Sequence, residues 1–216
     1  MIELIIKGLL AYLLGSIVGS LLIGKLRGVD IRTMGSGNAG ATNMLRTQGT
    51  VAALAVLSID LGKGWVATGV IAPWSIPGIA PAELEMRAPV IAVCGLAVIL
   101  GHVYPLWYGF RGGKGVATFL GAVLGINVML ALVMLLTWLV VVVLFGFVGL
   151  ASIASAVAVA AAIAAQTSSP RALLVFGILA TLLIIFTHRS NIARMWAGSE
   201  SRAKRLWLFG LRRGPS

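Results

Sequence analysis

The stretch that decides the fold is residues 116–165, VATFLGAVLGINVMLALVMLLTWLVVVVLFGFVGLASIASAVAVAAAIAA. It is apolar almost without interruption over about 50 residues, whereas a single membrane-spanning helix needs only about 20. A transmembrane β-barrel would show short segments of alternating polarity instead. Breaks occur near Asn127 and between Gly146 and Gly149. We therefore expect three rather short helices in this stretch.

Composition extends this interpretation to the whole chain. Of 216 residues, 59% are hydrophobic and 11% are charged, which is typical of a helical protein that crosses the membrane several times. We expect residues 1–216 to form a single membrane-embedded domain. The net charge of +11 suits anionic headgroups or an anionic substrate. No basic, aromatic soluble module is evident, so nucleic acid is not expected as a partner.

Further spans are expected in residues 4–23, 51–71, 90–107 and 172–186. Basic residues cluster in segments 25–46, 111–114 and 189–213, and such clusters favour the cytoplasmic side of a membrane. Placing all three clusters on one side requires an odd number of spans between the second and the third. The sequence thus predicts an all-α, polytopic bundle of seven transmembrane helices, with the N-terminus outside and the C-terminus in the cytoplasm.

A glycine- and amide-rich motif, Gly35-Ser-Gly-Asn-Ala-Gly-Ala-Thr-Asn43, lies in the first basic segment and is followed by Arg46. Glycines allow several backbone N–H groups to turn towards one anion, and an arginine suits phosphate. The spacing also matches the dinucleotide fingerprint, but that motif requires a βαβ unit, which these long apolar runs do not offer. A flexible loop without a ligand remains the other alternative.

A second glycine-basic turn is Gly112-Gly-Lys-Gly115. It departs twice from a Walker A loop, because Tyr108 stands where the first glycine should be and Gly115 stands where a hydroxyl residue should be. An NTPase is therefore not expected. The glycine amides, Lys114 and the helix N-terminus that follows would suit a phosphate group. The alternative is a cationic anchor on the cytoplasmic side of the membrane.

Several other polar residues lie at informative spacings. If the chain continues as a helix, His188 and Asn191 share a face, in either a structural or a functional role. Asp60 and Lys63 fall inside a predicted span, where charges are costly, so we expect a mutual ion pair that orients the site side of the bundle. His102 is expected to tether a helix end.

The sequence lacks the residues for metal-dependent chemistry and for one common acyltransferase mechanism. The chain has two histidines far apart and six scattered acidic residues, so we expect no metal site and no cofactor. A His-x-x-x-x-Asp acyltransferase dyad is also missing, since Trp107 and Ala193 stand at the required spacing. Acyl transfer through that dyad is therefore not expected.

Three ordered motifs nevertheless resemble the bacterial acyl-phosphate:glycerol-3-phosphate acyltransferases over nearly the whole chain. They are Gly35 to Asn43 with Arg46; Gly101-His102-x-x-Pro105 with Phe110-x-Gly-Gly-Lys-Gly-Val-Ala-Thr118; and His188-Arg-x-Asn-Ile-x-Arg194 with Gly198-x-Glu200. The resemblance implies transfer of a fatty acyl group from acyl phosphate to the sn-1 hydroxyl of glycerol 3-phosphate. The products would be lysophosphatidic acid and inorganic phosphate, in the first step of phospholipid synthesis. The enzyme would lie in the inner (plasma) membrane with its active site facing the cytoplasm.

The resemblance also implies residue roles. Glycerol phosphate would be bound by Ser36, Asn38, Thr42, Asn43, Arg46, Lys114, Ser152, His188 and Asn191. Acyl phosphate would be bound by Gly112, Gly113, Lys114 and Gly115. Catalysis would involve His188, Asn191, Lys114 and Ser36, whereas the structural residues would be Asp60, Lys63, His102 and Glu200. The partners would be the two substrates and membrane lipid, and we expect a monomer.

Two questions remain open at the level of sequence. A transporter or exchanger of a phosphorylated solute would also use buried charges and anion sites, although no internal repeat of the kind common in transporters is evident. For an acyltransferase, the proton of the acceptor hydroxyl could pass to His188 or to a substrate phosphate. We favour the phosphate, because Arg46 and Lys114 would hold one close to the hydroxyl.

Overall fold

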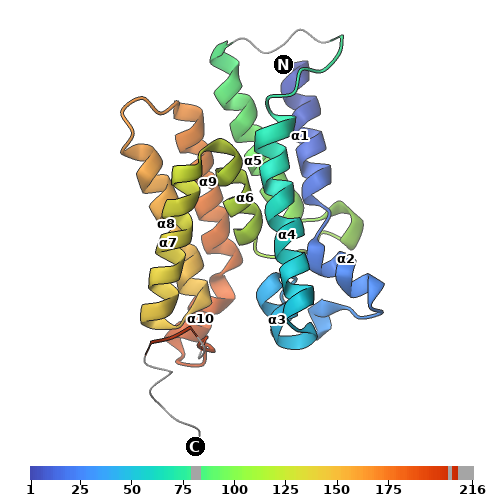
Figure 1. Ribbon diagram of the computed structural model, residues 1–216, viewed down its shortest axis with the longest axis vertical. Helices are drawn as coiled ribbons and strands as arrows, with labels where there is room; N and C mark the ends of the chain where they lie inside the picture. The colour runs from blue at the N-terminus through green and yellow to red at the C-terminus, as the bar shows by residue number, and fades with distance from the viewer. Residues whose placement is uncertain (79–83, 204–205, 209–216) are drawn as a thin grey trace, which may run out of the picture.

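The computed structural model describes residues 1–78, 84–203 and 206–208, and within these ranges the regular secondary structure is helical. Figure 1 shows the long helices packed side by side along the long axis of the molecule. In chain order the helices are α1 (Ile2–Gly15), α2 (Gly19–Leu26), η1 (Ile31–Thr33), α3 (Ala41–Gln48), α4 (Thr50–Val66), η2 (Ala67–Ile71), η3 (Leu84–Met86), α5 (Arg87–Val103), η4 (Leu106–Tyr108), α6 (Val116–Ile126), α7 (Val128–Phe145), α8 (Val148–Ala164), α9 (Arg171–Thr187) and α10 (Arg189–Trp196).

Helix length and apolarity agree with a bundle embedded in a membrane. Among the described residues, three helical segments are long and apolar enough to cross a bilayer: Thr50–Ile71, Arg87–Tyr108 and Val128–Phe145. Two bent pairs, α1 with α2 and α9 with α10, pass the same test if each is taken as one span. Helices α6 and α8 are apolar but shorter.

The long apolar run divides where the sequence predicts. Asn127 ends α6 and caps α7, because its side-chain oxygen accepts a hydrogen bond of 2.8 Å from the N–H of Met129. Gly146 ends α7 in the left-handed conformation, with φ of 78°, and α8 begins two residues later. The prediction of three helices in this run is thus confirmed.

The first predicted span differs from a single straight helix. It is broken into α1 and α2 with a bend of 43° between them. Lys63 Nζ donates to the carbonyl oxygens of Gly15 and Ile17, at 2.9 and 2.7 Å, whereas Asp60 Oδ1 accepts from the N–H of Gly19 at 3.1 Å. The break is stable because α4 supplies a cation to the free carbonyls of α1 and an anion to the free N–H at the start of α2.

The same two side chains form the ion pair that the sequence predicts. Lys63 Nζ lies 3.0 Å from Asp60 Oδ1, and both side chains are almost fully buried. His102 joins them, with Nδ1 at 2.9 Å from Lys63 Nζ and 3.4 Å from Asp60 Oδ1. The pair is therefore confirmed, and it connects α1, α2, α4 and α5 at one point in the interior.

Close helix contacts depend on glycine. A Cβ atom at Gly101 of α5 would overlap the carbonyl oxygen of Tyr12 in α1, and one at Gly121 of α6 would overlap that of Leu61 in α4. Backbone-to-backbone packing of this kind is favoured between helices in membranes. It brings α4 and α6 close together, so that the loop before α6 lies beside the loops at the lower end of the bundle.

The two ends of the bundle differ in character. Helix α1 begins at the upper end in Figure 1, and α2, α3 and α10 gather at the lower end. All three polar motifs lie in or next to these lower elements. The three polar motifs, which are far apart in the sequence, therefore lie at the same end of the bundle.

Candidate active site

A cavity of about 980 Å³ lies at this lower end, between the first-motif loop, α4, α6, α7, α8 and α10. Its lining residues fall into a polar group and an apolar group. The polar group includes all of the residues expected to bind glycerol phosphate, namely Ser36, Asn38, Thr42, Asn43, Arg46, Lys114, Ser152, His188 and Asn191. Residues separated by up to about 150 positions in the sequence therefore share one site.

The first-motif loop is held in shape by Asn43. Its Nδ2 donates to the carbonyl oxygens of Ile31 and Met34, at 3.1 and 2.9 Å, and its Oδ1 accepts from the N–H of Ser36 at 2.9 Å. The Asn43 side chain is buried, and a Cβ atom at Gly35, where φ is 55°, would overlap its Oδ1. Asn43, which the sequence predicts to bind glycerol phosphate, lines the cavity, but its own hydrogen bonds serve the loop.

Other side chains of the first motif are available to a ligand. In the described part of the chain, no hydrogen bond to protein is found for the side chains of Ser36, Thr42 or Arg46, and all three line the cavity. Thr42 lies in the first turn of α3, where an anion is favoured, and Arg46 follows one turn later in the last turn of the same helix. This group can hold a phosphate through a guanidinium and two hydroxyl groups.

The second motif differs from the expected cradle. The N–H groups of Gly112 and Gly113 donate to the carbonyl oxygens of Val103 and His102, at 3.0 and 3.1 Å, so neither is free for a ligand. Neither glycine lines the cavity. A Cβ atom at Gly113 would overlap Nε2 of His102 and the carbonyl oxygen of Ala39. These two glycines serve close packing, which corrects the expectation that their amides bind acyl phosphate.

The remaining two residues of that motif do face the cavity. Gly115, with φ of 85°, is the N-cap of α6, and the first amides of a helix have no partner within it. Lys114 Nζ donates to Oδ1 of Asn191, and its backbone carbonyl accepts from Oγ1 of Thr187 at 3.1 Å. The cationic centre of the site is therefore Lys114 together with the N-terminus of α6.

Burial changes the acidity of this lysine. Burial of Lys114 and the positive charge of Arg194 lower its pKa to about 8, against a smaller opposing effect of Glu200. The ammonium group is therefore less stable at this position than in water. An anionic ligand beside it would restore the charge.

The third motif lies at the bend between α9 and α10, which is 54°. His188 is buried at this junction, with Nδ1 at 2.8 Å from the carbonyl oxygen of Ile184. A carbonyl oxygen only accepts, so Nδ1 carries the proton and Nε2 is the ring nitrogen left for a ligand. His188 thus has one fixed nitrogen and one that can serve the site.

Asn191 is fixed from both sides. Its Nδ2 donates to Oε1 of Glu200 at 2.6 Å, while its Oδ1 accepts from Lys114. Oε2 of Glu200 accepts from Nε of Arg194 at 2.6 Å. Because the carboxylate can only accept, it dictates which end of the Asn191 amide faces Lys114. Sequence reasoning places Glu200 among the structural residues but misses this connection.

Helix α8 closes the polar part of the cavity. Ser152 lines it, and its hydroxyl donates to the carbonyl oxygen of Val148 at 2.9 Å, which leaves the oxygen able to accept a further hydrogen bond. A Cβ atom at Gly149 would lie only 2.9 Å from Cβ of Asn191. The close approach of α8 to α10 therefore helps to fix Asn191.

The apolar part of the cavity was not predicted residue by residue. Its wall comes from α4, α6 and α7 and consists of Leu57, Leu61, Leu120, Met134, Leu135 and Trp138. In the sequence these residues cannot be told from lipid-facing ones, because both kinds lie in apolar helices. A wall of this character, continuous with a cationic centre, suits an amphiphile with a phosphate head and an apolar chain.

Among the described residues, no group of three or more His, Cys, Asp or Glu side chains could hold a metal ion. Of the four residues expected to be structural, Asp60, His102 and Glu200 also line the cavity. His102 reaches the second motif as well, because its carbonyl oxygen accepts from Gly113. The expected role of His102 as a tether agrees with these contacts.

The known proteins that are similar to this chain share one description. The family described as "Glycerol-3-phosphate acyltransferase" matches residues 5–198. A glycerol-3-phosphate acyltransferase of Laribacter hongkongensis is 42% identical over 194 residues, which are 89% of this chain and 92% of the relative. One from Staphylococcus aureus is 39% identical over 206 residues, covering 95% of this chain and 99% of the relative.

The structure has a similar counterpart among solved structures. A crystal structure of PlsY (YgiH), an integral membrane glycerol 3-phosphate acyltransferase in its glycerol 3-phosphate form, matches with a TM-score of 0.80 and 36% identity. The match covers 92% of this chain and 94% of that one. A lysophosphatidic acid form of PlsY matches with a TM-score of 0.79. Sequence, fold and site geometry agree, and the chain belongs to the glycerol-3-phosphate acyltransferase family.

Proposed function

We propose that this chain transfers a fatty acyl group from acyl phosphate to the sn-1 hydroxyl of glycerol 3-phosphate, as the first step of phospholipid synthesis. The acceptor oxygen forms an ester bond with the acyl carbon, and the bond from that carbon to the phosphate oxygen breaks. Lysophosphatidic acid and inorganic phosphate are the products. Family membership supports the acceptor, and the two ligand forms of the similar PlsY structure name the acceptor and the product.

The observation that carries this proposal is the continuity of the cavity. Its polar part contains Arg46 and Lys114, and its apolar part runs along α4, α6 and α7. Two phosphates need two cationic places, and the acyl chain of the donor needs an apolar wall. Glycerol 3-phosphate alone would need only the polar part.

Within the cavity we assign the acceptor to the first motif and the donor to the second. The free hydroxyl groups of Ser36 and Thr42, with Arg46, support an acceptor site. For the donor, Lys114 and the N-terminal amides of α6 take the place of the two glycine amides that are already engaged. A preorganised cation and helix amides would also stabilise the negative charge on the acyl oxygen during attack.

The remaining step is transfer of the proton of the acceptor hydroxyl to a base. We propose a substrate phosphate, whose second pKa is about 6, as for phosphoryl groups on proteins. His188 holds one ring nitrogen on Ile184 and would use the other to orient the acceptor. Asn191, whose amide orientation is fixed by Glu200, would place Lys114.

We further propose seven membrane passes, with the N-terminus outside, the C-terminus in the cytoplasm and the cavity facing the cytoplasm of a monomer in the inner membrane. The alternation of α1, α4, α5, α6, α7, α8 and α9 along the bundle supports this count. At about 1.5 Å per residue, the 11 residues of α6 reach only about half of a 30 Å apolar core. The fourth pass, formed by α6, would therefore begin inside the bundle, beside the cavity.

The donor is tested with purified protein and labelled glycerol 3-phosphate. Acyl phosphate should release inorganic phosphate and make the label lipid-soluble in equal amounts, whereas acyl-CoA and acyl-carrier protein should not. Efficient transfer from acyl-CoA would refute the donor. Movement of glycerol 3-phosphate across vesicles without esterification would instead support a transporter.

Topology is tested with single cysteines in a Cys94→Ala background. Ser75 and Thr33 are both exposed and lie at opposite ends of the bundle. An impermeant thiol reagent added outside intact cells should label Ser75→Cys and spare Thr33→Cys until the cells are opened. Labelling of both positions from outside would contradict the proposed orientation.

A further inference from the structure

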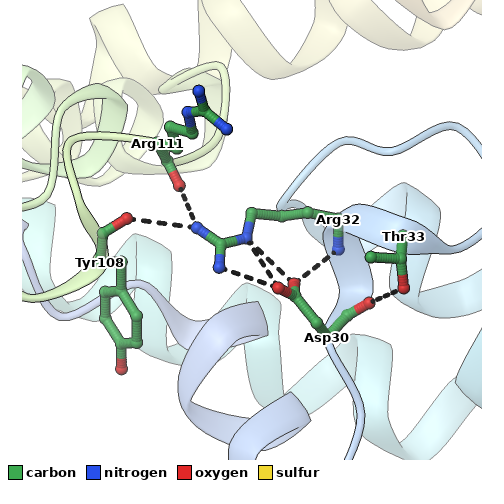
Figure 2. Close-up of polar contacts among 5 residues, drawn as sticks. All are labelled: Asp30, Arg32, Thr33, Tyr108 and Arg111. Atoms are coloured by element: carbon green, nitrogen blue, oxygen red, sulfur yellow. Dashed lines mark hydrogen bonds and ion pairs between the residues drawn. The ribbon is translucent and has the colours of Figure 1, made fainter.

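Arg32 makes an inter-loop contact that lies outside the cavity. This residue is in η1, just before the first motif. Its Nη1 donates to the carbonyl oxygens of Tyr108 and Arg111, at 3.2 and 3.4 Å. Figure 2 shows the guanidinium group between these carbonyls on one side and the carboxylate of Asp30 on the other. One side chain therefore joins two loops that are separated by more than 70 residues in the sequence.

Asp30 fixes the guanidinium in this position. Its two carboxylate oxygens accept from Nε of Arg32, at 3.0 and 3.2 Å, and Oδ2 also accepts from Nη2 at 2.8 Å. Oδ1 accepts from the N–H of Arg32 as well, at 3.0 Å, and so caps η1. The hydrogen bonds from the Arg32 side chain and backbone lower the pKa of Asp30 below its usual value. The pair is therefore fully ionised at neutral pH.

Each of the two joined loops continues directly into the active site. Arg32 precedes Ser36 by four residues, and Arg111 precedes Lys114 by three. The loops also meet at a second point, where the carbonyl oxygen of Ala39 lies against Gly113 so closely that no Cβ atom would fit. Two points of contact fix how one loop lies against the other, whereas one point would leave a hinge.

Neither Asp30 nor Arg32 is among the residues that line the cavity. We propose that the Asp30–Arg32 pair is a positioning device that holds the loop carrying Ser36 in register with the loop carrying Lys114. It would thereby set the distance between acceptor and donor without touching either substrate. This inference rests on the proposed function, because it needs one substrate on each loop.

The expected kinetic signature differs from that of a binding residue. Each loop keeps its own phosphate contacts when the Asp30–Arg32 pair is removed, so the KM for each substrate should change little. The reacting atoms must approach to about 3–3.5 Å, and a misplacement of about 1 Å can cost about 100-fold in rate. The loss should therefore fall on kcat.

The signature also differs from that of a structural ion pair. The side chains of Arg32 and Asp30 are 33% and 42% exposed, and pairs exposed to this degree contribute little to stability. Removal of the Asp30–Arg32 pair should therefore leave the melting temperature nearly unchanged. A fall in kcat without a fall in Tm is the result that a merely structural role would not give.

The test compares Arg32→Ala, Arg32→Lys and Asp30→Asn with wild type under saturating acyl phosphate and glycerol 3-phosphate. Wild-type turnover is measured first, and its absence would count against the proposed function alone. Arg32→Ala should lower kcat by about 10- to 100-fold, with both KM values within about 3-fold. Arg32→Lys should recover little, because an ammonium group cannot span both the carboxylate and the two carbonyls.

Arg27→Ala is the matched control. Arg27 is also exposed, lies just after α2 and donates to the carbonyl oxygen of Gln48 at 3.2 Å, but it does not link the two motif loops. This variant should keep the wild-type kcat. A double Asp30→Ala/Arg32→Ala variant should be no slower than Arg32→Ala, because the pair acts as a unit.

A readout independent of turnover completes the experiment. Spin labels at Thr33→Cys and Arg111→Cys in a Cys94→Ala background report the distance between the loops, and Arg32→Ala should broaden its distribution. An unchanged distribution with wild-type kcat would overturn the inference. So would a rise in the KM of only one substrate, or a loss of kcat that merely follows a lower Tm.

Discussion

Glu200 offers the sharpest test of how the site is organised, because its carboxylate accepts from Asn191, whose amide oxygen in turn accepts from Lys114. Its side chain is 9% exposed, and its carboxylate accepts one hydrogen bond from Asn191 and one from Arg194, both of 2.6 Å. Glu200→Leu removes both acceptors. The Asn191 amide can then rotate and present its NH₂ group to Lys114, where an acceptor is required.

The size of the effect follows from these contacts. A hydrogen bond to a charged group is worth about 1.5–3 kcal/mol. If that amount is lost from the transition state, kcat falls by about 10- to 150-fold. Glu200→Gln should lie at the lower end, because its amide oxygen can still accept from Asn191 while its NH₂ group faces Arg194. The two variants therefore separate the Asn191 contact from the Arg194 contact.

Phosphate release from acyl phosphate at saturating substrate is the assay, with Arg189→Ala as a control. Arg189 is exposed in α10, the helix that carries Asn191. It donates to the carbonyl oxygen of Phe186, away from the cavity. Its variant should keep wild-type kcat. A double Asn191→Ala/Glu200→Leu variant should be about as slow as Asn191→Ala alone. Fully additive losses, or a wild-type kcat in Glu200→Leu, would refute the reasoning.

Four further outcomes are expected. The pKa of Lys114 is lowered to about 8, so its charge is present below that pH and lost above it. We therefore expect kcat/KM to fall as pH rises beyond about 8, and Lys114→Arg to move this fall to higher pH. Arg46→Ala should chiefly raise the KM for glycerol 3-phosphate, as titration of initial rates would show. His188→Gln should lower kcat but keep the acidic limb of the pH–rate profile; a limb that vanishes in the variant would make His188 the base. Lys63→Met should destabilise the fold by about 3–5 kcal/mol in unfolding experiments, because Asp60 would remain buried without its cation.

Much of the architecture is determined locally and was therefore visible in the sequence. The length of an apolar run sets how many helices it can hold, and Asn127 and Gly146 end helices through their own backbone and side-chain preferences. The spacing of Asp60 and Lys63 places them on one helix face, so their ion pair needs no knowledge of the rest of the chain. The three motifs and their common end of the bundle likewise followed from residue type and charge.

The interior contacts required the folded chain. The break between α1 and α2 exists because a helix nearly fifty residues later supplies both a cation and an anion to the free backbone groups. Gly112 and Gly113 look like an anion cradle in the sequence, yet their amides serve His102 and Val103. A glycine pattern alone does not show whether the glycine amides face a ligand or a neighbouring backbone, because close approach of either one requires the absence of a side chain.

The sequence by itself thus determined a helical membrane protein with a phosphate-handling site, because apolar length, glycine and basic charge act over short distances. Only the tertiary structure decided that Glu200 orients Asn191 towards Lys114 and that Arg32 joins the two loops. The residues in these contacts are nine to nearly eighty positions apart, and they come together through helix packing at glycine contacts such as that of Gly101 with Tyr12. Distances across a bundle are set by such packing, which no local spacing encodes.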